Sequence, residues 1–179
     1  SEYRDAFVMK INNSGILEWA FNFGTQDDGA HGKSVSIDGL GNAYFSGEYW
    51  YGTIDFDPGP GVYNMSASTG LTYILKLNPN GNFIWAKQFG YYPSMEECFV
   101  GGAELHSGVN GDLYITGGFW GEGIIDFDPN AGLDTITPIS SSFYYQDMYI
   151  LKWTDSGNFV WKNTVANSSY KMYGTSLTE

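Results

Sequence analysis

Residues 72–90 read TYILKLNPNGNFIWAKQFG, and the chain contains three versions of this segment. Residues 6–24 read AFVMKINNSGILEWAFNFG, and residues 148–166 read MYILKWTDSGNFVWKNTVA. A lysine, a glycine and a tryptophan stand at matching places in all three versions. Self-similarity at a fixed period indicates a repeat architecture.

A second pair of similar segments lies between these stretches. GLGNAYFSG at 39–47 resembles VNGDLYITG at 109–117, and IDFDP at 54–58 recurs unchanged at 125–129. Both kinds of segment return at a similar spacing, which gives a repeating unit of about 70 residues.

Each unit divides into short β-type runs, because Val, Ile, Tyr, Phe and Trp dominate the runs and turn residues separate them. Short connections rich in Gly and Asn predict tight hairpins at one end of the strands. The longer connections then gather at the opposite end, which we call the long-loop face. We predict eight strands in two complete units, at residues 34–38, 43–47, 73–78, 83–89, 100–106, 113–117, 148–154 and 159–165.

Four-stranded antiparallel sheets repeated at this period predict an all-β fold made of β-propeller blades. A two-sheet β-sandwich is the alternative, and the internal repeat disfavours it because a sandwich needs none. We predict a half blade at 1–31, complete blades at 32–90 and 91–166, and the start of another half blade at 167–179. Since a propeller has about four to eight blades, we expect either a segment of a longer propeller or several copies that close a ring together.

Composition narrows the classes of partner. The 179 residues carry a net charge of −12, which repels phosphate backbones and anionic headgroups, so a nucleic-acid partner is not expected. No apolar run approaches the roughly 20 residues that cross a bilayer, so membrane insertion is not expected either. The single cysteine, Cys98, is predicted to be a buried and inert thiol.

The segments GNAYFSG, TIDFDPGPG and YILKLNPNGNFIWAKQFG together resemble the SBBP β-propeller repeat of secreted and surface proteins from Bacteroidetes and other bacteria. The resemblance covers almost the whole chain. It implies a seven-bladed type of propeller, a secreted or cell-surface location, and often sorting by the type IX secretion machinery. The family offers no catalytic residues to transfer. Residues 162–166 depart from its pattern, because KNTVA replaces AKQFG there.

The two copies of IDFDP place Asp55 with Asp57, and Asp126 with Asp128, two residues apart. On an extended backbone each pair projects to one side, and carboxylate oxygens gathered in this way bind Ca²⁺. The Pro that follows in each copy also predicts a structural turn, in which the carboxylates accept backbone N–H groups. Calcium sites and structural turns are therefore both open, and recurrence in each unit favours the turn.

Aromatic residues gather where the chain reaches the long-loop face. Exposed rings there would bind a protein or a glycan, whereas buried rings would fill space between blades. The candidate ligand-binding residues are Tyr49, Trp50, Tyr51, Tyr91, Tyr92, Phe119 and Trp120.

The repeated tryptophans and lysines have structural interpretations. Trp19, Trp85 and Trp161 hold one fixed place in each unit, as a recurring contact between blades requires. The repeated lysines in the apolar runs are expected to pair with carboxylates, because a cation in apolar surroundings needs a partner of opposite charge. These lysines are Lys10, Lys76 and Lys152.

The first functional hypothesis is a non-catalytic scaffold or recognition module that binds a protein or a glycan through the long-loop face. The alternative is a polysaccharide lyase or glycoside hydrolase that uses two carboxylates. Its candidate residues are Asp55, Asp126, Glu48 and Glu122. The sequence contains no GxSxG, HExxH or P-loop motif, so no catalytic residue is assigned.

Overall fold

The computed structural model describes residues 4–24, 29–91, 98–139 and 146–165, and every regular element in these ranges is a β-strand. The all-β prediction is confirmed, and each of the eight predicted strands overlaps an observed one. The strands are β1 (Ala6–Ile11), β2 (Leu17–Phe23), β3 (Ala30–Ile37), β4 (Ala43–Tyr49), β5 (Gly52–Asp55), β6 (Asn64–Ala67), β7 (Leu71–Leu77), β8 (Phe83–Tyr91), β9 (Cys98–Ser107), β10 (Leu113–Gly121), β11 (Ile125–Asp126), β12 (Thr135–Ile136), β13 (Asp147–Trp153) and β14 (Phe159–Val165).

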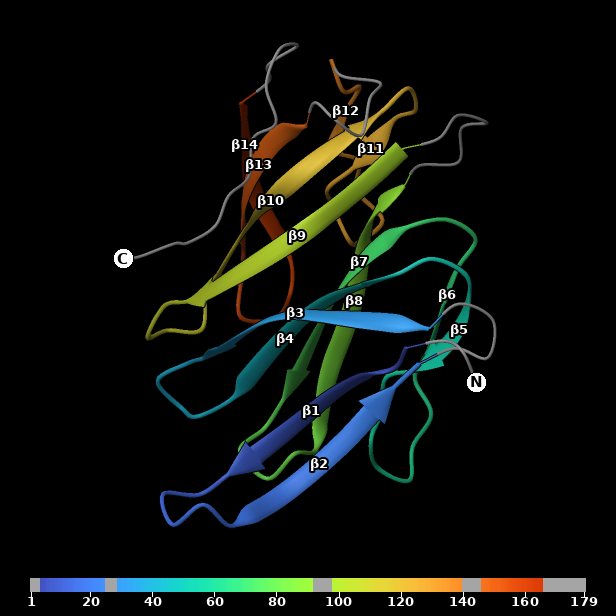
Figure 1. The fold of residues 1–179 in the computed structure, drawn as a ribbon. Helices are drawn as coiled ribbons and strands as arrows, with labels where there is room; N and C mark the ends of the chain where they lie inside the picture. Colours follow the sequence, from blue (N-terminus) through green and yellow to red (C-terminus); the bar gives the residue numbers. More distant parts are fainter. Residues whose placement is uncertain (1–3, 25–28, 92–97, 140–145, 166–179) are drawn as a thin grey trace.

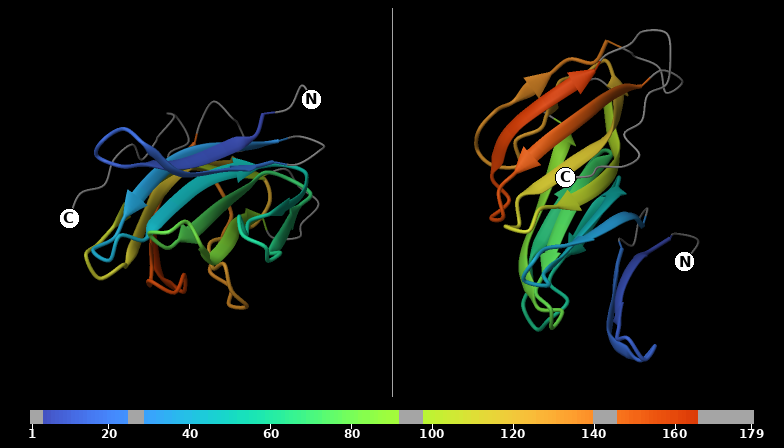
Figure 2. Two further views of the ribbon diagram at one scale, coloured as in Figure 1. Left: turned by 90° about the horizontal axis from the view of Figure 1, so that it is seen from below. Right: turned by 90° about the vertical axis from the view of Figure 1, so that its left-hand side faces the viewer.

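Antiparallel pairing groups the main strands into three modules. The N-terminal module is β1–β2, the middle module has the order β3-β4-β7-β8, and the C-terminal module has the order β9-β10-β13-β14. Figure 1 shows the modules following one another, from blue through green to orange, and the right panel of Figure 2 shows the same succession from the side.

One strand register recurs in all three modules. In each, the repeated lysine lies opposite the repeated tryptophan of the next strand, and the register shifts directly after the lysine. Such a bulge lets two residues face one and increases the local twist. The pairs are Lys10↔Trp19, Lys76↔Trp85 and Lys152↔Trp161.

The connections from β4 to β7 and from β10 to β13 differ from the prediction, which treated them as long loops. Each contains a two-stranded hairpin, β5–β6 in the first and β11–β12 in the second. Strand β11 also pairs with β8, opposing Ile125 to Tyr91, and so extends the sheet of the middle module to six strands. The alternation of apolar and acidic residues in IDFDP is a strand pattern, and it was too short to stand out from its glycine-rich surroundings.

Two hydrophobic clusters fill the spaces between the modules. The first joins Phe23 of the N-terminal module to Phe45 and Leu75 of the middle module. The second joins Phe89 of the middle module to Trp153 of the C-terminal module, with ring centroids 5.3 Å apart. Since each cluster draws on two modules, neighbouring modules stabilise each other.

The repeated tryptophans pack unequally. Trp19 packs against the first cluster and Trp85 against the second, as predicted. Trp161, the last of the three, is 39% exposed, because no described residue covers that side of the C-terminal module. The packing prediction therefore holds for two of the three positions.

Candidate functional site

Two of the predicted ligand-binding residues are core residues. Tyr49 and Phe119 have no exposed surface. Tyr49 contacts the ring of Phe56, and Phe119 contacts that of Phe127, with centroids 6.1 and 5.7 Å apart. Tyr49 is the last residue of β4 and Phe119 lies near the end of β10, and in this structure neither ring has surface that a ligand could contact.

The remaining aromatic candidates lead to a continuous row of rings. Trp50 and Phe99 are nearly parallel, at 11° between planes and 6.1 Å between centroids. Phe99 lies 6.2 Å from Trp120, and His31 lies edge-on to Trp50 at 5.2 Å. All four rings are partly exposed. We call this set the aromatic row.

The aromatic row crosses from one module to the next. Trp50 follows β4 and His31 lies in β3 of the middle module, whereas Phe99 and Trp120 lie in β9 and β10 of the C-terminal module. The sequence identified the two tryptophans but missed His31 and Phe99, because His31 meets Trp50 through the pairing of β3 with β4, and Phe99 meets Trp50 through contact between modules. Tyr51, which follows Trp50 in the chain, is 53% exposed.

Two other predicted aromatic residues fall at the edge of the described chain. Tyr92, and the side chain of Tyr91, lie outside the described residues. The row is therefore defined by residues from the ends of β3, β4, β9 and β10 alone.

The repeated aspartates form matching turns. The Asp55 carboxylate accepts the backbone N–H groups of Asp57 and Tyr63, at 3.0 and 2.8 Å. Asp126 accepts those of Asp128 and Asp134 in the same way, both at 3.0 Å. These contacts support the structural-turn hypothesis, in which the carboxylates replace backbone partners.

The apolar residues of the same motif anchor each turn. Phe56 and Phe127 have no exposed surface, and they pack on Tyr73 and Tyr149 with centroids 5.0 and 5.2 Å apart. Thus IDFDP alternates buried anchors with aspartates that bind the backbone of their own loop.

Calcium fits these turns poorly. Ca²⁺ takes six to eight oxygen ligands, whereas the described residues contain no group of three or more His, Cys, Asp or Glu placed to hold a metal. Asp57 and Asp128 also each accept a backbone N–H, from Gly59 and Asn130. We therefore base no function on calcium, and the metal stays a prediction.

Replacing Asp126 separates the two hypotheses. Burial is the largest influence on the Asp126 carboxyl, and it raises the pKa of this group in the folded chain. The protonated carboxyl therefore stabilises the folded state fully when the pH is below the ordinary pKa of 3.8, and this stabilisation is lost as the pH rises through the folded-state pKa. At neutral pH, Asp126→Asn removes this disfavoured charge and keeps the oxygen acceptor, so we expect unchanged or increased stability. Asp126→Ala leaves two N–H groups without their acceptor and should cost about 1 kcal/mol.

Urea unfolding at neutral pH, with and without a chelator, measures both effects. A chelator that lowers the stability of the unmodified chain would contradict the turn hypothesis, because a bound ion stabilises the folded state by mass action. Equal losses in Asp126→Asn and Asp126→Ala would contradict it as well.

The carboxylates of the enzyme hypothesis have varied surroundings. The buried Glu48 accepts the backbone N–H of Gly102 at 2.7 Å and lies 3.5 Å from the ammonium group of Lys33. Asp55 and Asp126 form the turns described above, and Glu122 is exposed. Nothing in these contacts favours a catalytic pair.

Glu48 lies at a join between modules. Burial first, and the Glu48 charge second, raise the pKa of Tyr73 and Tyr149, so both hydroxyls remain donors. They donate to the backbone carbonyls of His31 and Gly101, at 3.4 Å in each case. Glu48 therefore contributes to the packing of the middle module on the C-terminal module.

Cys98 is buried, and burial raises its thiol pKa to about 11. The thiol is thus protonated at neutral pH, as expected for an inert cysteine.

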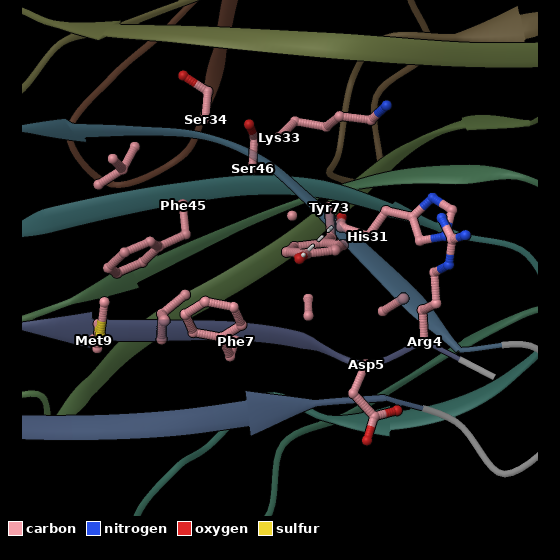
Figure 3. A pocket seen from close by; sticks show the side chains of 15 residues that line it. Arg4, Asp5, Phe7, Met9, His31, Lys33, Ser34, Phe45, Ser46 and Tyr73 are labelled. Carbon is pink, nitrogen blue, oxygen red and sulfur yellow. Dashed lines mark hydrogen bonds between the residues drawn. The ribbon is translucent and has the colours of Figure 1, made fainter. Parts of the chain in front are cut away.

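A cleft of about 520 Å³ lies between β1 and the β3–β4 pair (Figure 3). Phe7, Met9 and Phe45 supply apolar walls, and Arg4 and Lys33 supply positive charge. Among the described strands, β1 pairs only with β2, whereas its counterparts β7 and β13 each have two partners. The cleft is therefore the gap beside the unpaired edge of β1.

Comparison with known proteins adds no relative. A scan against models of protein families and a search of curated protein sequences both found no match. Within the described residues there is also no helix of the length and apolarity that a membrane crossing requires.

Proposed function

We propose that the chain is a β-propeller segment of a secreted or cell-surface protein, and that it is a non-catalytic recognition module. The modules would be its blades. This proposal is supported by the two four-stranded antiparallel modules with the same strand order, and by the clusters that join successive modules. The resemblance to SBBP repeats supports the location and export by type IX secretion machinery.

The aromatic row carries the functional part of the proposal. Three partly exposed rings from two modules follow one another in space, Trp50, Phe99 and Trp120. The centroid of Phe99 lies 6.1 Å from that of Trp50 and 6.2 Å from that of Trp120. Aromatic residues of this kind dominate the binding energy of protein interfaces. Their position on a rigid β scaffold is typical of binding surfaces.

Between the two ligand classes, we favour a protein with a basic contact surface. Rings that are stacked on one another share part of their faces, which leaves less of each face for a sugar ring and favours contact with side chains. The net charge of −12 would attract a basic partner at a rate that falls with added salt.

Binding assays against defined panels of extracellular proteins and glycans test this proposal. Tyr51→Ala and Trp120→Ala should each lower the affinity for a protein ligand at least about tenfold. Leu40→Ala is the matched control, because Leu40 is an 81% exposed apolar residue in the short β3–β4 connection, away from the row. Its affinity should match that of the unmodified chain.

Two outcomes would overturn the proposal. Glycan binding that depends on the same residues would replace the protein ligand with a glycan, and turnover of a polysaccharide that one carboxylate substitution abolishes would replace recognition with catalysis. An experimental structure tests the assignment of the modules as propeller blades. The assignment requires that the middle and C-terminal modules are related by rotation about a shared axis, and any other relation would contradict it.

A further inference from the structure

The N-terminal module grips a turn of the middle module. The Lys10 ammonium and the Trp19 indole N–H both donate to the backbone carbonyl of Pro79, at 2.9 and 3.4 Å. Pro79 lies in the β7–β8 hairpin turn, which begins at Asn78. A lysine and a tryptophan from adjacent strands thus hold one carbonyl of the next module.

The middle module grips the C-terminal module in the same manner. Lys76 and the Trp85 indole N–H donate to the backbone carbonyl of Asp155, at 3.4 and 3.0 Å. Asp155 occupies the same place in the β13–β14 turn as Pro79 in its own turn. Here the Tyr44 hydroxyl also donates to the Asp155 carboxylate at 2.9 Å, and Lys76 pairs with that carboxylate.

We call a lysine and a tryptophan that together bind the turn of another module a clamp. A third such pair, Lys152 and Trp161, lies at the exposed side of the C-terminal module. The Lys152 ammonium lies 5.4 Å from the centre of the Tyr114 ring, as Lys76 lies 4.8 Å from that of Tyr44. The Tyr114 and Trp161 rings are 6.3 Å apart, against 6.1 Å for Tyr44 and Trp85. The geometry of the occupied clamp is thus already present.

The contacts of this third clamp remain within its own module. Lys152 pairs with Asp112 at 2.9 Å, and Trp161 is 39% exposed. No described residue of another module occupies the place that Pro79 and Asp155 take in the other two clamps. We call Tyr114, Lys152 and Trp161 the terminal clamp.

The β1–β2 turn of the N-terminal module matches the two turns that the other clamps hold. The β1–β2 turn closes with the same two backbone hydrogen bonds as the gripped turns, from Asn12 to Ile16 and from Gly15 to Asn12, both at 2.9 Å. Asn13 takes the place of Pro79 and Asp155 and is exposed. We call residues 12–16 the terminal turn.

The glycine of each hairpin turn shows whether another module packs against that turn. A Cβ on Gly81 would lie 3.1 Å from Trp19, and one on Gly157 would lie 3.3 Å from Trp85. A Cβ on Gly15 would meet nothing within 4 Å. The terminal turn therefore has the shape of a gripped turn and an open surface where the tryptophan would pack.

We propose that the terminal clamp is a binding site for the terminal turn of a second copy of this chain. Lys152 and Trp161 of one copy donate to the Asn13 carbonyl of the next, which continues the two interfaces already formed within the chain. The contact joins unlike surfaces, so it is heterologous, and successive copies form a ring or a filament. This inference concerns the ends of the array and stands apart from recognition on the long-loop face.

The side chain at position 13 sets the strength of the contact. Pro79 shows that the carbonyl alone suffices for the grip, whereas Asp155 adds a carboxylate that pairs with Lys76. Asn13→Asp should therefore raise the association constant by about threefold, and Asn13→Lys should lower it by a similar factor because it opposes Lys152. Both effects should shrink as salt is added.

Sedimentation velocity of the 179-residue chain over a wide concentration range tests the proposal. The unmodified chain should form concentration-dependent oligomers, and Trp161→Ala should lower the association constant at least about tenfold. Val109→Ala is the control, because Val109 is 84% exposed in the short β9–β10 connection, outside both surfaces. Circular dichroism checks that each variant is folded, and the Asn13 variants remain informative if Trp161→Ala is not.

Mixing two variants separates this contact from general adhesion of apolar surface. The Asn13→Lys chain keeps its clamp, and the Trp161→Ala chain keeps its turn, so a mixture contains one fully intact pair of surfaces and should associate more strongly than either variant alone. A monomer at every concentration would overturn the proposal. Oligomers that are unchanged by Asn13→Asp, Asn13→Lys and Trp161→Ala would overturn it equally.

Discussion

Trp153→Ala is expected to lower the free energy of unfolding by about 3–5 kcal/mol, the range for truncating a buried tryptophan. Trp153 has no exposed surface and lies in the cluster between the middle and C-terminal modules. Its ring contacts Phe89 edge-on, at 5.3 Å between centroids. The truncation would leave a cavity between two modules, which should unfold together. Urea denaturation followed by fluorescence and by circular dichroism measures the loss.

Two variants control for this result. Trp153→Phe should cost only about 1 kcal/mol, because it keeps most of the ring and removes an indole N–H that has no hydrogen-bond partner among the described residues. Trp161→Ala, measured in dilute solution, removes the same kind of side chain from a 39% exposed position and should cost much less. A similar loss at positions 153 and 161 would mean that the inter-module cluster does not stabilise the fold.

The strands could be predicted because their signals are local. Alternating apolar residues and a glycine turn specify a hairpin without reference to the rest of the chain, and three versions of residues 72–90 reinforced one another. The β11–β12 hairpin escaped prediction because β11 has two residues and pairs with β8, which lies far away in the sequence. Such pairing is decided by tertiary structure.

The candidate site was only partly predictable for the same reason. Trp50 and Trp120 occupy matching places in the two units, the first directly after β4 and the second near the end of β10, so their role was visible in the repeat. Tyr49 and Phe119 precede them by one residue, and successive residues of a strand point to opposite sides, so these two rings are buried. Phe99 completes the row only because two modules meet.

The lysine prediction shows how far a repeat determines an environment. Each of the three lysines does pair with a carboxylate, as expected. Their burial differs widely, since the side chain of Lys76 is 3% exposed, whereas those of Lys10 and Lys152 are 42% and 23% exposed. Position in the array, which the local sequence does not encode, sets how much each pair matters.

Lys76→Ala is therefore expected to cost about 3 kcal/mol, because it leaves a buried carboxylate without its cation. The Asp38 carboxylate lies 3.9 Å from the Lys76 ammonium, and its side chain is 2% exposed. Burial alone would raise the pKa of Asp38, but hydrogen bonds from Asn42 and Leu40 and the charge of Lys76 outweigh it and lower the pKa below 3.8. Asp38 thus stays charged at neutral pH, and the substitution leaves this buried charge without a cation beside it.

The pH dependence of the loss identifies its cause. A lowered folded-state pKa gives stability that is present above the unfolded value of 3.8 and is lost as the pH falls through the folded value. The cost of Lys76→Ala, measured by urea unfolding, should therefore shrink below pH 3.8, where Asp38 takes up a proton. Asp38→Asn, combined with Lys76→Met, should recover most of the loss, because removing both charges removes the desolvation problem. Lys152→Ala, at the exposed copy of the same position, should change stability little. If the two alanine variants lose equal stability, or if the cost of Lys76→Ala is the same at acid and neutral pH, the buried pair of Lys76 and Asp38 does not stabilise the middle module.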